Sequence, residues 1–203
     1  MASLDAWVRL IAGPGAVEQV DPMDEAALMA RLAATLPLRQ ETIKILGREV
    51  KTPRLTSWHG DPGASYVYSK TLFVPEPWTD ELSLVRRWLF ESVGVDFNGV
   101  LVNHYRDGED AMGWHSDDEP ELGPRAPDDV LIASVSLGAP RRFLMRPRRE
   151  SDGLGGTRAW DLGGGNLFLM GGTTQRLWRH RLARTAKMVG PRLNLTFRMV
   201  RSR

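Results

Sequence analysis

Two histidines and one aspartate have the residue types and spacing of a metal site. His115 and Asp117 stand two positions apart within the segment Trp114-His-Ser-Asp-Asp-Glu119. In an extended strand, residues i and i+2 point to the same face, so this imidazole and this carboxylate lean toward a common point. His180, on a distant strand, could close the triangle. Two histidines and one carboxylate on one face of a metal leave positions open for a co-substrate and O2, which suits non-haem Fe(II) and predicts an oxygenase.

A lone His-x-Asp triplet arises by chance in many proteins, so the rest of the chain has to support a metal site. Of the four histidines, His59 and His104 receive no role here. The absence of cysteine excludes thiolate ligation and disulfides. A histidine in a strand is more often a core or surface residue than a ligand, and on the triplet alone that alternative stays open.

A late segment alternates polar and apolar residues in the manner of a strand. Its polar positions carry two guanidinium groups, an amide and a hydroxyl: Arg192, Asn194, Thr196 and Arg198. Such a strand could lie at a sandwich edge with this face in water. If the face instead lined a barrel mouth, the buried arginines would need anions, and a small dicarboxylate such as 2-oxoglutarate supplies two carboxylates. Asn103 and Tyr105 share the two-residue stagger and could complete this cradle, or serve only as a strand-end hydrogen bond and core filling.

The elements that must position these residues are two helices and a series of strands. Helical periodicity predicts packing helices over about 22–36 and 80–93, the second between the capping Thr79 and the stop at Gly94. Short apolar or alternating runs follow at 99–105, 130–137, 142–146, 166–170 and 192–200. This order predicts one α+β domain over 1–203, in which the helices back one sheet of a jelly roll at about 95–200.

The segment at about 40–70 differs from the rest and is expected to form a substrate-recognition lid. Residues 42–51 predict a hairpin with its tip at Gly47. Tyr66 and Tyr68 share one face of a following strand. Aromatic and arginine residues around a hairpin that precedes the barrel would suit a cover over its mouth.

Composition and charge narrow the class of protein. A chain of 203 residues, 42% hydrophobic and 26% charged, is typical of one globular domain. The net charge is only +2, but arginines bunch within 141–149 and 176–184 and could form a phosphate-binding face or a merely solvated basic surface. There is no apolar run of membrane-spanning length and no signal peptide at the N-terminus, so we expect a cytoplasmic protein, or a nuclear one in a eukaryote.

Together these motifs resemble the AlkB family of iron- and 2-oxoglutarate-dependent nucleic-acid dealkylases. The matching segments are Asn103-His-Tyr-Arg106, Trp114-His-Ser-Asp-Asp-Glu-Pro120, Trp178-Arg-His-Arg181 and Pro191-Arg-Leu-Asn-Leu-Thr-Phe-Arg198, with Pro53–Trp58 and Tyr66–Ser69 upstream. The similarity covers about 46–200 in order. It is closer to the branch with an H-S-D-D-E-P motif and a hairpin wedge.

The resemblance implies a role for each matched residue, within a double-stranded β-helix fold. The Fe(II) ligands would be His115, Asp117 and His180. The 2-oxoglutarate site would consist of Asn103, Tyr105, Arg192, Asn194, Thr196 and Arg198. The substrate contacts would be Leu46, Gly47 and Arg48 at the hairpin tip, Tyr66 and Tyr68, and the acidic pair Asp118 and Glu119.

The substrate contacts have specific implied tasks and plain alternatives. Tyr68 would stack on a flipped base, with His115 as the opposing wall. Asp118 and Glu119 would favour a cationic methylated base, or form a solvated acidic loop. Leu46 would be an intercalating wedge, or an ordinary core leucine.

The implied reaction is oxidative demethylation of N-alkylated bases of the 1-methyladenine and 3-methylcytosine type, a direct reversal of alkylation damage with O2 as co-substrate. The implied partner is alkylated DNA, with RNA as an alternative, and we expect a monomer without a membrane partner. Two other functions stay open: a 2-oxoglutarate oxygenase acting on a protein or small molecule, and a non-catalytic nucleic-acid-binding module. The sequence does not distinguish single strands from duplexes or identify the lesion.

Overall fold

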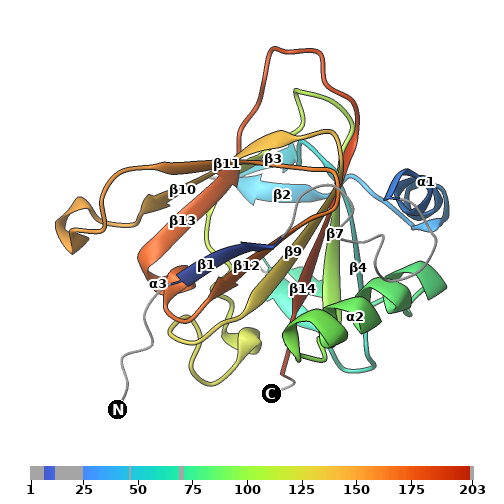
Figure 1. The fold of residues 1–203 in the computed structure, drawn as a ribbon, viewed down its shortest axis with the longest axis horizontal. Helices are drawn as coiled ribbons and strands as arrows, with labels where there is room; N and C mark the ends of the chain where they lie inside the picture. The colour runs from blue at the N-terminus through green and yellow to red at the C-terminus, as the bar shows by residue number, and fades with distance from the viewer. Residues whose placement is uncertain (1–6, 12–24, 46, 69–70, 202–203) are drawn as a thin grey trace.

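The computed structural model describes residues 7–11, 25–45, 47–68 and 71–201, and two antiparallel sheets that face each other form its centre (Figure 1). The six-stranded sheet has the order β1 (Trp7–Ile11), β12 (Asn166–Gly171), β9 (Ile132–Gly138), β14 (Arg192–Arg198), β7 (Gly99–Tyr105) and β4 (Leu55–Gly60). The four-stranded sheet has the order β11 (Arg158–Leu162), β10 (Arg141–Pro147), β13 (Trp178–Leu182) and β8 (Met112–His115). This is the predicted jelly roll.

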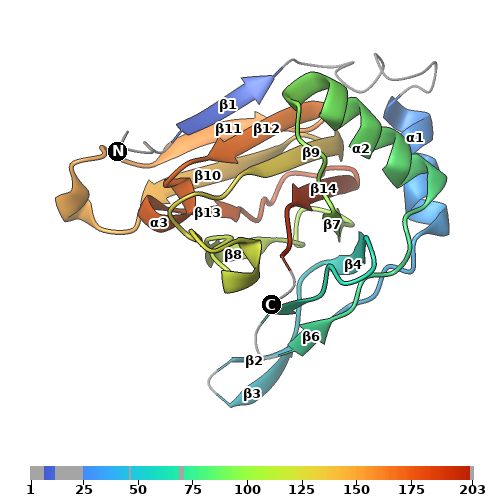
Figure 2. The same ribbon diagram turned by 90° about the horizontal axis from the view of Figure 1, so that it is seen from below.

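Two hairpins, three α-helices and two 3-10 helices, at Pro120–Leu122 and Glu150–Asp152, complete the described fold. The hairpins are β2 (Thr42–Ile45) with β3 (Arg48–Lys51), and β5 (Tyr66–Tyr68) with β6 (Thr71–Phe73). The helices are α1 (Glu25–Thr35), α2 (Asp80–Val93) and the short α3 (Thr174–Leu177). Figure 2 shows α1 and α2 together on one side of the molecule and the four-stranded sheet on the other. None of the helices in the described part of the chain combines the length and apolarity that a membrane span requires.

Two hydrophobic cores lie on opposite faces of the six-stranded sheet. The first joins Leu32 of α1 and Leu89 of α2 to Leu195 of β14. The second fills the space between the sheets and includes Phe168 of β12 and Met145 of β10. The helices therefore back one sheet, as predicted, and leave the space between the sheets for the site.

Strand β14 decides between the two interpretations of its alternating pattern. Leu193, Leu195 and Phe197 belong to the core under the helices. All seven residues of the strand are buried, so the polar face does not lie in water at a sandwich edge. It faces the space between the sheets, where a buried charge needs a partner.

Helix α2 begins and ends where the sequence predicts. Thr79 Oγ1 accepts a hydrogen bond from the backbone N–H of Leu82 at 3.3 Å. Gly94 ends the helix with a φ of 72°, a left-handed conformation that favours glycine. The first helix begins at Glu25 within the described residues, whereas its predicted start at 22–24 lies outside them.

The cap of α2 gives a stability prediction. Thr79→Ala is expected to lower the free energy of unfolding by about 1 kcal/mol, because it removes the acceptor for a helix-terminal N–H. Urea denaturation would measure the change. Glu91→Ala, an exposed change on the same helix, is the control and should shift the free energy by less than about 0.5 kcal/mol. Equal stability of the two variants would contradict the role of Thr79.

Candidate metal centre and adjoining cavity

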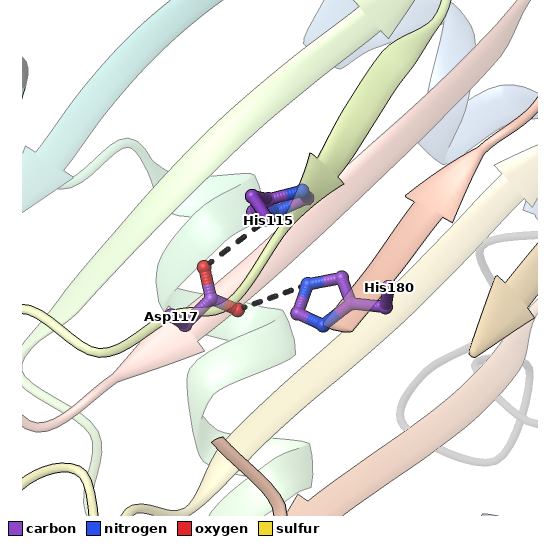
Figure 3. A group of neighbouring side chains, drawn as sticks. All are labelled: His115, Asp117 and His180. Atoms are coloured by element: carbon purple, nitrogen blue, oxygen red, sulfur yellow. Dashed lines mark ion pairs between the residues drawn. The ribbon is translucent and has the colours of Figure 1, made fainter. Parts of the chain in front are cut away.

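His115, Asp117 and His180 meet on the inner face of the four-stranded sheet (Figure 3). His115 is the last residue of β8, and it pairs across the sheet with His180 of β13. The carboxylate oxygens of Asp117 lie 3.6 Å from His180 Nε2 and 4.0 Å from His115 Nε2. One ligand atom from each residue lies within 4.8 Å of the others, so the three side chains can reach one ion.

The expectation that His115 and Asp117 share one strand face is wrong. Strand β8 ends at His115, and Asp117 lies in the loop that follows. The backbone N–H of Asp117 donates to Gln175 Oε1 at 3.0 Å, and Ser116 Oγ donates to the carbonyl of Trp178 at 2.8 Å. These two bonds tie the loop to the segment that leads into β13. The acid therefore joins the histidines through tertiary contacts rather than through strand alternation.

The ionisation of the three residues suits a divalent metal. Burial lowers the pKa of both imidazoles, that of His180 to about 3, so both rings are neutral and keep a lone pair. Burial alone would raise the pKa of Asp117, but the charge of Arg198 beside it outweighs burial and lowers the pKa. Arg198 Nη2 donates to Asp117 Oδ1 at 2.8 Å.

The ring nitrogens confirm that the donor set fits a metal. His115 Nδ1 lies 2.8 Å from the carbonyl oxygen of Gly113, which can only accept, so Nδ1 carries the proton and Nε2 is left as a donor atom. His180 Nδ1 is buried and has no hydrogen-bond partner among the described residues. Two neutral imidazoles and one carboxylate are the ligands of an Fe(II) site with open positions.

A cavity between the sheets joins the triad to the polar face of β14. All six residues predicted to hold a dicarboxylate line it: Asn103, Tyr105, Arg192, Asn194, Thr196 and Arg198. Its wall also includes the triad and residues from one edge strand of each sheet, such as Thr56 of β4 and Met112 of β8. The structure thus brings together two sets of residues that are far apart in the sequence.

Arg192 is a buried cation with no acidic partner among the described residues. It is 2% exposed, and no carboxylate of the described residues lies within 4.0 Å of its nitrogens. Its Nη2 donates to Ser136 Oγ and to Asn194 Oδ1, both at 2.7 Å. Burial lowers the pKa of Arg192 to about 10, because the charge is removed from water. The guanidinium therefore favours binding of an anion in the cavity.

The two arginines of β14 differ, although the sequence pattern treats them alike. Arg198 already has an anion, since it pairs with Asp117 and lies 3.7 Å from Glu119 Oε1. Asn194 Nδ2 donates to Thr196 Oγ1 at 2.8 Å, which fixes the polar residues between the two arginines. Of the two arginines of β14, Arg192 is therefore the one suited to bind an external carboxylate.

Two further residues belong to the site and were assigned no role from the sequence. Arg54 is buried in the cavity wall, and its Nε donates to Asn103 Oδ1 at 2.8 Å. Gln175 is fully buried and holds the backbone of Asp117. Arg54 lies in a segment that carries the family resemblance, which was its only signal, whereas no local pattern identifies Gln175.

The predicted substrate contacts are only partly placed. Leu46 and the side chains of Tyr66 and Tyr68 lie outside the described residues. Gly47 forms the hairpin tip with a φ of 81°, and Arg48 is exposed on β3; neither lines the cavity.

The acidic residues Asp118 and Glu119, which follow Asp117 in the sequence, lie near different arginines. Asp118 pairs with Arg148. Glu119 lines the cavity near Arg198, and burial raises the pKa of Glu119 to about 7.

The contact between Gln175 and Asp117 gives a prediction for metal binding. Gln175→Leu is expected to weaken Fe(II) or Co(II) binding roughly tenfold or more, because removing a group that orients a ligand typically costs 10–100-fold in affinity. Gln175→Glu retains the acceptor oxygen and should retain more of the affinity. Co(II) absorption titration would measure both. Equal affinity of Gln175→Leu and the wild type would show that the loop is held without this bond.

Comparisons with known proteins agree with this geometry. Residues 16–198 match the family model described as the 2OG-Fe(II) oxygenase superfamily. The chain is 36% identical over 187 residues to alpha-ketoglutarate-dependent dioxygenase alkB homolog 3 of Bos taurus, covering 89% of this chain and 63% of that protein. It is 39% identical over 163 residues to DNA oxidative demethylase ALKBH2 of Mus musculus, covering 78% of this chain and 66% of that protein. The chain therefore spans slightly less than two thirds of the length of these relatives.

A solved structure supports the fold. The structure of OsALKBH1 superimposes with a TM-score of 0.65 at 17% sequence identity, covering 95% of this chain and 97% of that one. At this level of identity the likeness shows the jelly-roll fold alone.

Proposed function

The chain belongs to the 2OG-Fe(II) oxygenase superfamily, and on that premise we propose that it is a dioxygenase that demethylates N-alkylated bases in DNA. The observation that carries the proposal is one cavity lined both by His115, Asp117 and His180 and by Arg192, whose buried guanidinium pairs with no acid of the described residues. The names of the relatives, a dioxygenase and a DNA oxidative demethylase, support the reaction and the substrate class.

The residues that line the cavity would have different roles in an oxygenase reaction. His115, Asp117 and His180 would hold Fe(II). When bound with 2-oxoglutarate and O2, the metal supplies oxidation of a methyl C–H bond coupled to decarboxylation of the keto acid to succinate. Arg192 would bind a carboxylate of 2-oxoglutarate, since a guanidinium grips a carboxylate in a bidentate fork. Arg198 keeps Asp117 ionised and in place.

The remaining polar groups orient the ones that bind. Ser136 and Asn194 accept from Arg192 and direct its guanidinium. Arg54 holds the amide of Asn103, which places the other end of that amide toward the cavity. We assign Tyr105, whose ring lies 5.4 Å from the Arg192 guanidinium, to the same dicarboxylate site together with Thr196.

Recognition of the base is assigned to the segment at about 40–70 as a lid over the jelly roll. Leu46, Gly47 and Arg48 would contact the strand, and Tyr66 and Tyr68 would contact the flipped base. Asp118 and Glu119 would favour a base that carries positive charge. If the substrate is DNA, we expect the protein in the nucleus of a eukaryote and otherwise in the cytoplasm. We expect a monomer, because residues of one chain form the site.

The test is aerobic incubation with an oligonucleotide that carries 1-methyladenine or 3-methylcytosine. Mass spectrometry should show the loss of one methyl equivalent that depends on both Fe(II) and 2-oxoglutarate, with release of formaldehyde. The same assay on paired and unpaired DNA and RNA determines the strand preference. Succinate formation that no methylated oligonucleotide stimulates would instead indicate an oxygenase acting on a protein or small molecule. No succinate with any substrate would indicate a binding module.

A further inference from the structure

The outer face of the four-stranded sheet carries arginines directly behind the metal ligands. On β13, His180 is buried in the sandwich, whereas its neighbours Arg179 and Arg181 alternate to the outside. On β10, the exposed Arg146 follows the buried Met145. On the edge strand β8, Trp114 precedes His115 and takes the outer side. We call Arg146, Arg179, Arg181 and Trp114 the arginine plate.

Two guanidinium groups of the arginine plate stack on one indole. The Cζ of Arg146 lies 4.3 Å from the centroid of the Trp114 ring, and the Cζ of Arg181 lies 4.8 Å from it. A cation over an aromatic face is held by the ring quadrupole, with its N–H donors directed sideways. The Nε of Arg181 is buried and has no hydrogen-bond partner in the part of the chain that the structure describes. Trp114 therefore orders the cations without neutralising them.

The charge of the arginine plate is not balanced within the described residues. Arg146 and Arg179 stand directly opposite each other on neighbouring strands, an arrangement in which like charges repel. Nearby arginines do have acids, since Arg142 pairs with Asp161 and Arg148 with Asp118. No carboxylate of the described residues lies within 4.0 Å of the three plate arginines. The sheet thus places cations together where only an external anion would relieve their repulsion.

The position of the arginine plate indicates which anion it suits. The plate begins at β8, the edge strand whose inner side lines the cavity through Met112 and His115. Three strands at a spacing of about 4.8 Å span about 10 Å. That distance corresponds to roughly three nucleotides at 3.4 Å each. A strand whose damaged base enters the cavity would have neighbouring phosphates within reach of this surface.

We propose that the arginine plate binds the phosphodiester backbone of the substrate strand beside the base that enters the cavity. This inference rests on the proposed function, because it assigns the phosphates that flank the lesion. Backbone contacts of this kind position a nucleic acid without reading its sequence. Binding through the plate is therefore indifferent to methylation and to base sequence.

The experiment compares Arg146→Gln/Arg179→Gln with a matched control, Arg31→Gln/Arg87→Gln. Both variants remove two exposed positive charges, but Arg31 and Arg87 lie on α1 and α2, on the opposite side of the molecule. Fluorescence anisotropy would measure binding of a labelled, unmethylated single-stranded oligonucleotide between about 50 and 200 mM salt. Circular dichroism of both variants would confirm that they fold.

The expected result is a loss of affinity and of salt dependence for the plate variant alone. Each phosphate contact to a single strand contributes about 0.7 to the slope of log affinity against log salt, so the slope should fall by about 1.4. At about 0.1 M salt the same two contacts correspond to a loss of roughly 25-fold. The control should keep the wild-type slope.

Each other outcome has a distinct meaning. Equal slopes for the two variants would overturn the arginine plate as a phosphate site, even if the wild type demethylates DNA. If the plate variant binds the oligonucleotide as well as the wild type does but binds vesicles of phosphatidylserine less well, the arginine plate is a membrane contact and the proposal is overturned. If the plate variant alone loses oligonucleotide binding while the wild type shows no demethylation, the result supports the phosphate site but contradicts the proposed reaction.

Discussion

Replacing Asp117 with alanine is expected to abolish turnover and to destabilise the fold at the same time. Asp117 is a member of the triad, and it is also the buried partner of Arg198. Breaking a buried ion pair by removing one partner typically costs about 3–5 kcal/mol. Here Arg198 would lose the carboxylate that it hydrogen-bonds at 2.8 Å, while Glu119 stays 3.7 Å away. We therefore expect Fe(II) binding to fall by more than about a hundredfold, and the free energy of unfolding to fall by about 3–5 kcal/mol.

The matched control is Asp118→Ala, which removes the neighbouring carboxylate. Asp118 is half-buried and pairs with Arg148, outside the triad. Because exposed ion pairs contribute about 0–1 kcal/mol, this variant should unfold close to the wild type and bind Co(II) normally. Urea denaturation and Co(II) titration measure both quantities. An Asp117→Ala protein as stable as Asp118→Ala would show that Arg198 does not depend on its partner.

Replacing Arg192 with methionine is expected to weaken the binding of 2-oxoglutarate without lowering the free energy of unfolding of the ligand-free protein. The change removes a buried charge that has no acidic partner among the described residues, and its side-chain acceptor Asn194 Oδ1 keeps hydrogen bonds from Ser134 and Ser136. The protein without ligand should therefore be as stable as the wild type or more stable. Loss of a buried charge-assisted contact to 2-oxoglutarate should weaken its binding by about 2–5 kcal/mol, or roughly thirtyfold and upward. The stabilisation that 2-oxoglutarate confers in a thermal shift assay should disappear.

Arg141 provides the comparison for this second prediction. It is also 2% exposed, but it donates to the backbone carbonyls of Asp107, Gly108, Asp110 and Ala183. Arg141→Met should therefore lower stability, because these buried acceptors lose their donor. If Arg192→Met also lowers the stability of the ligand-free protein, Arg192 is a structural residue. If 2-oxoglutarate still stabilises that variant, the dicarboxylate site lies elsewhere.

Local patterns were sufficient for elements whose two sides differ. Helix α2 could be predicted at both ends because a capping threonine and a left-handed glycine mark them. Strand β14 could be predicted because apolar and polar residues alternate, and burial of the polar side confirms the barrel interpretation. Strand β4 was missed because five of its six residues are buried and both of its faces mix polar with apolar side chains, so no alternation marks it.

Contacts between distant residues account for the rest of what the sequence did not reveal. Asp117 could be identified as a ligand, but the loop that carries it depends on Gln175, 58 residues later. Arg198 could be assigned to the cavity from the alternation of its strand, but its ion pair with Asp117, 81 residues earlier, could not be predicted. Arg54 meets Asn103 only because β4 pairs with β7. None of these partners is marked by spacing in the chain.

Strand β13 has one side in the cavity and the other outside, and this fixes how much its connections can change in length. A slip of one residue would exchange the two sides, so that an arginine would enter the cavity and His180 would leave it. An insertion or deletion between α3 and β13 should therefore be tolerated poorly. The 183–191 connection to β14 lies beyond the strand, is largely exposed, and can absorb added residues without shifting the register. We therefore expect related chains to differ in length mainly in this connection.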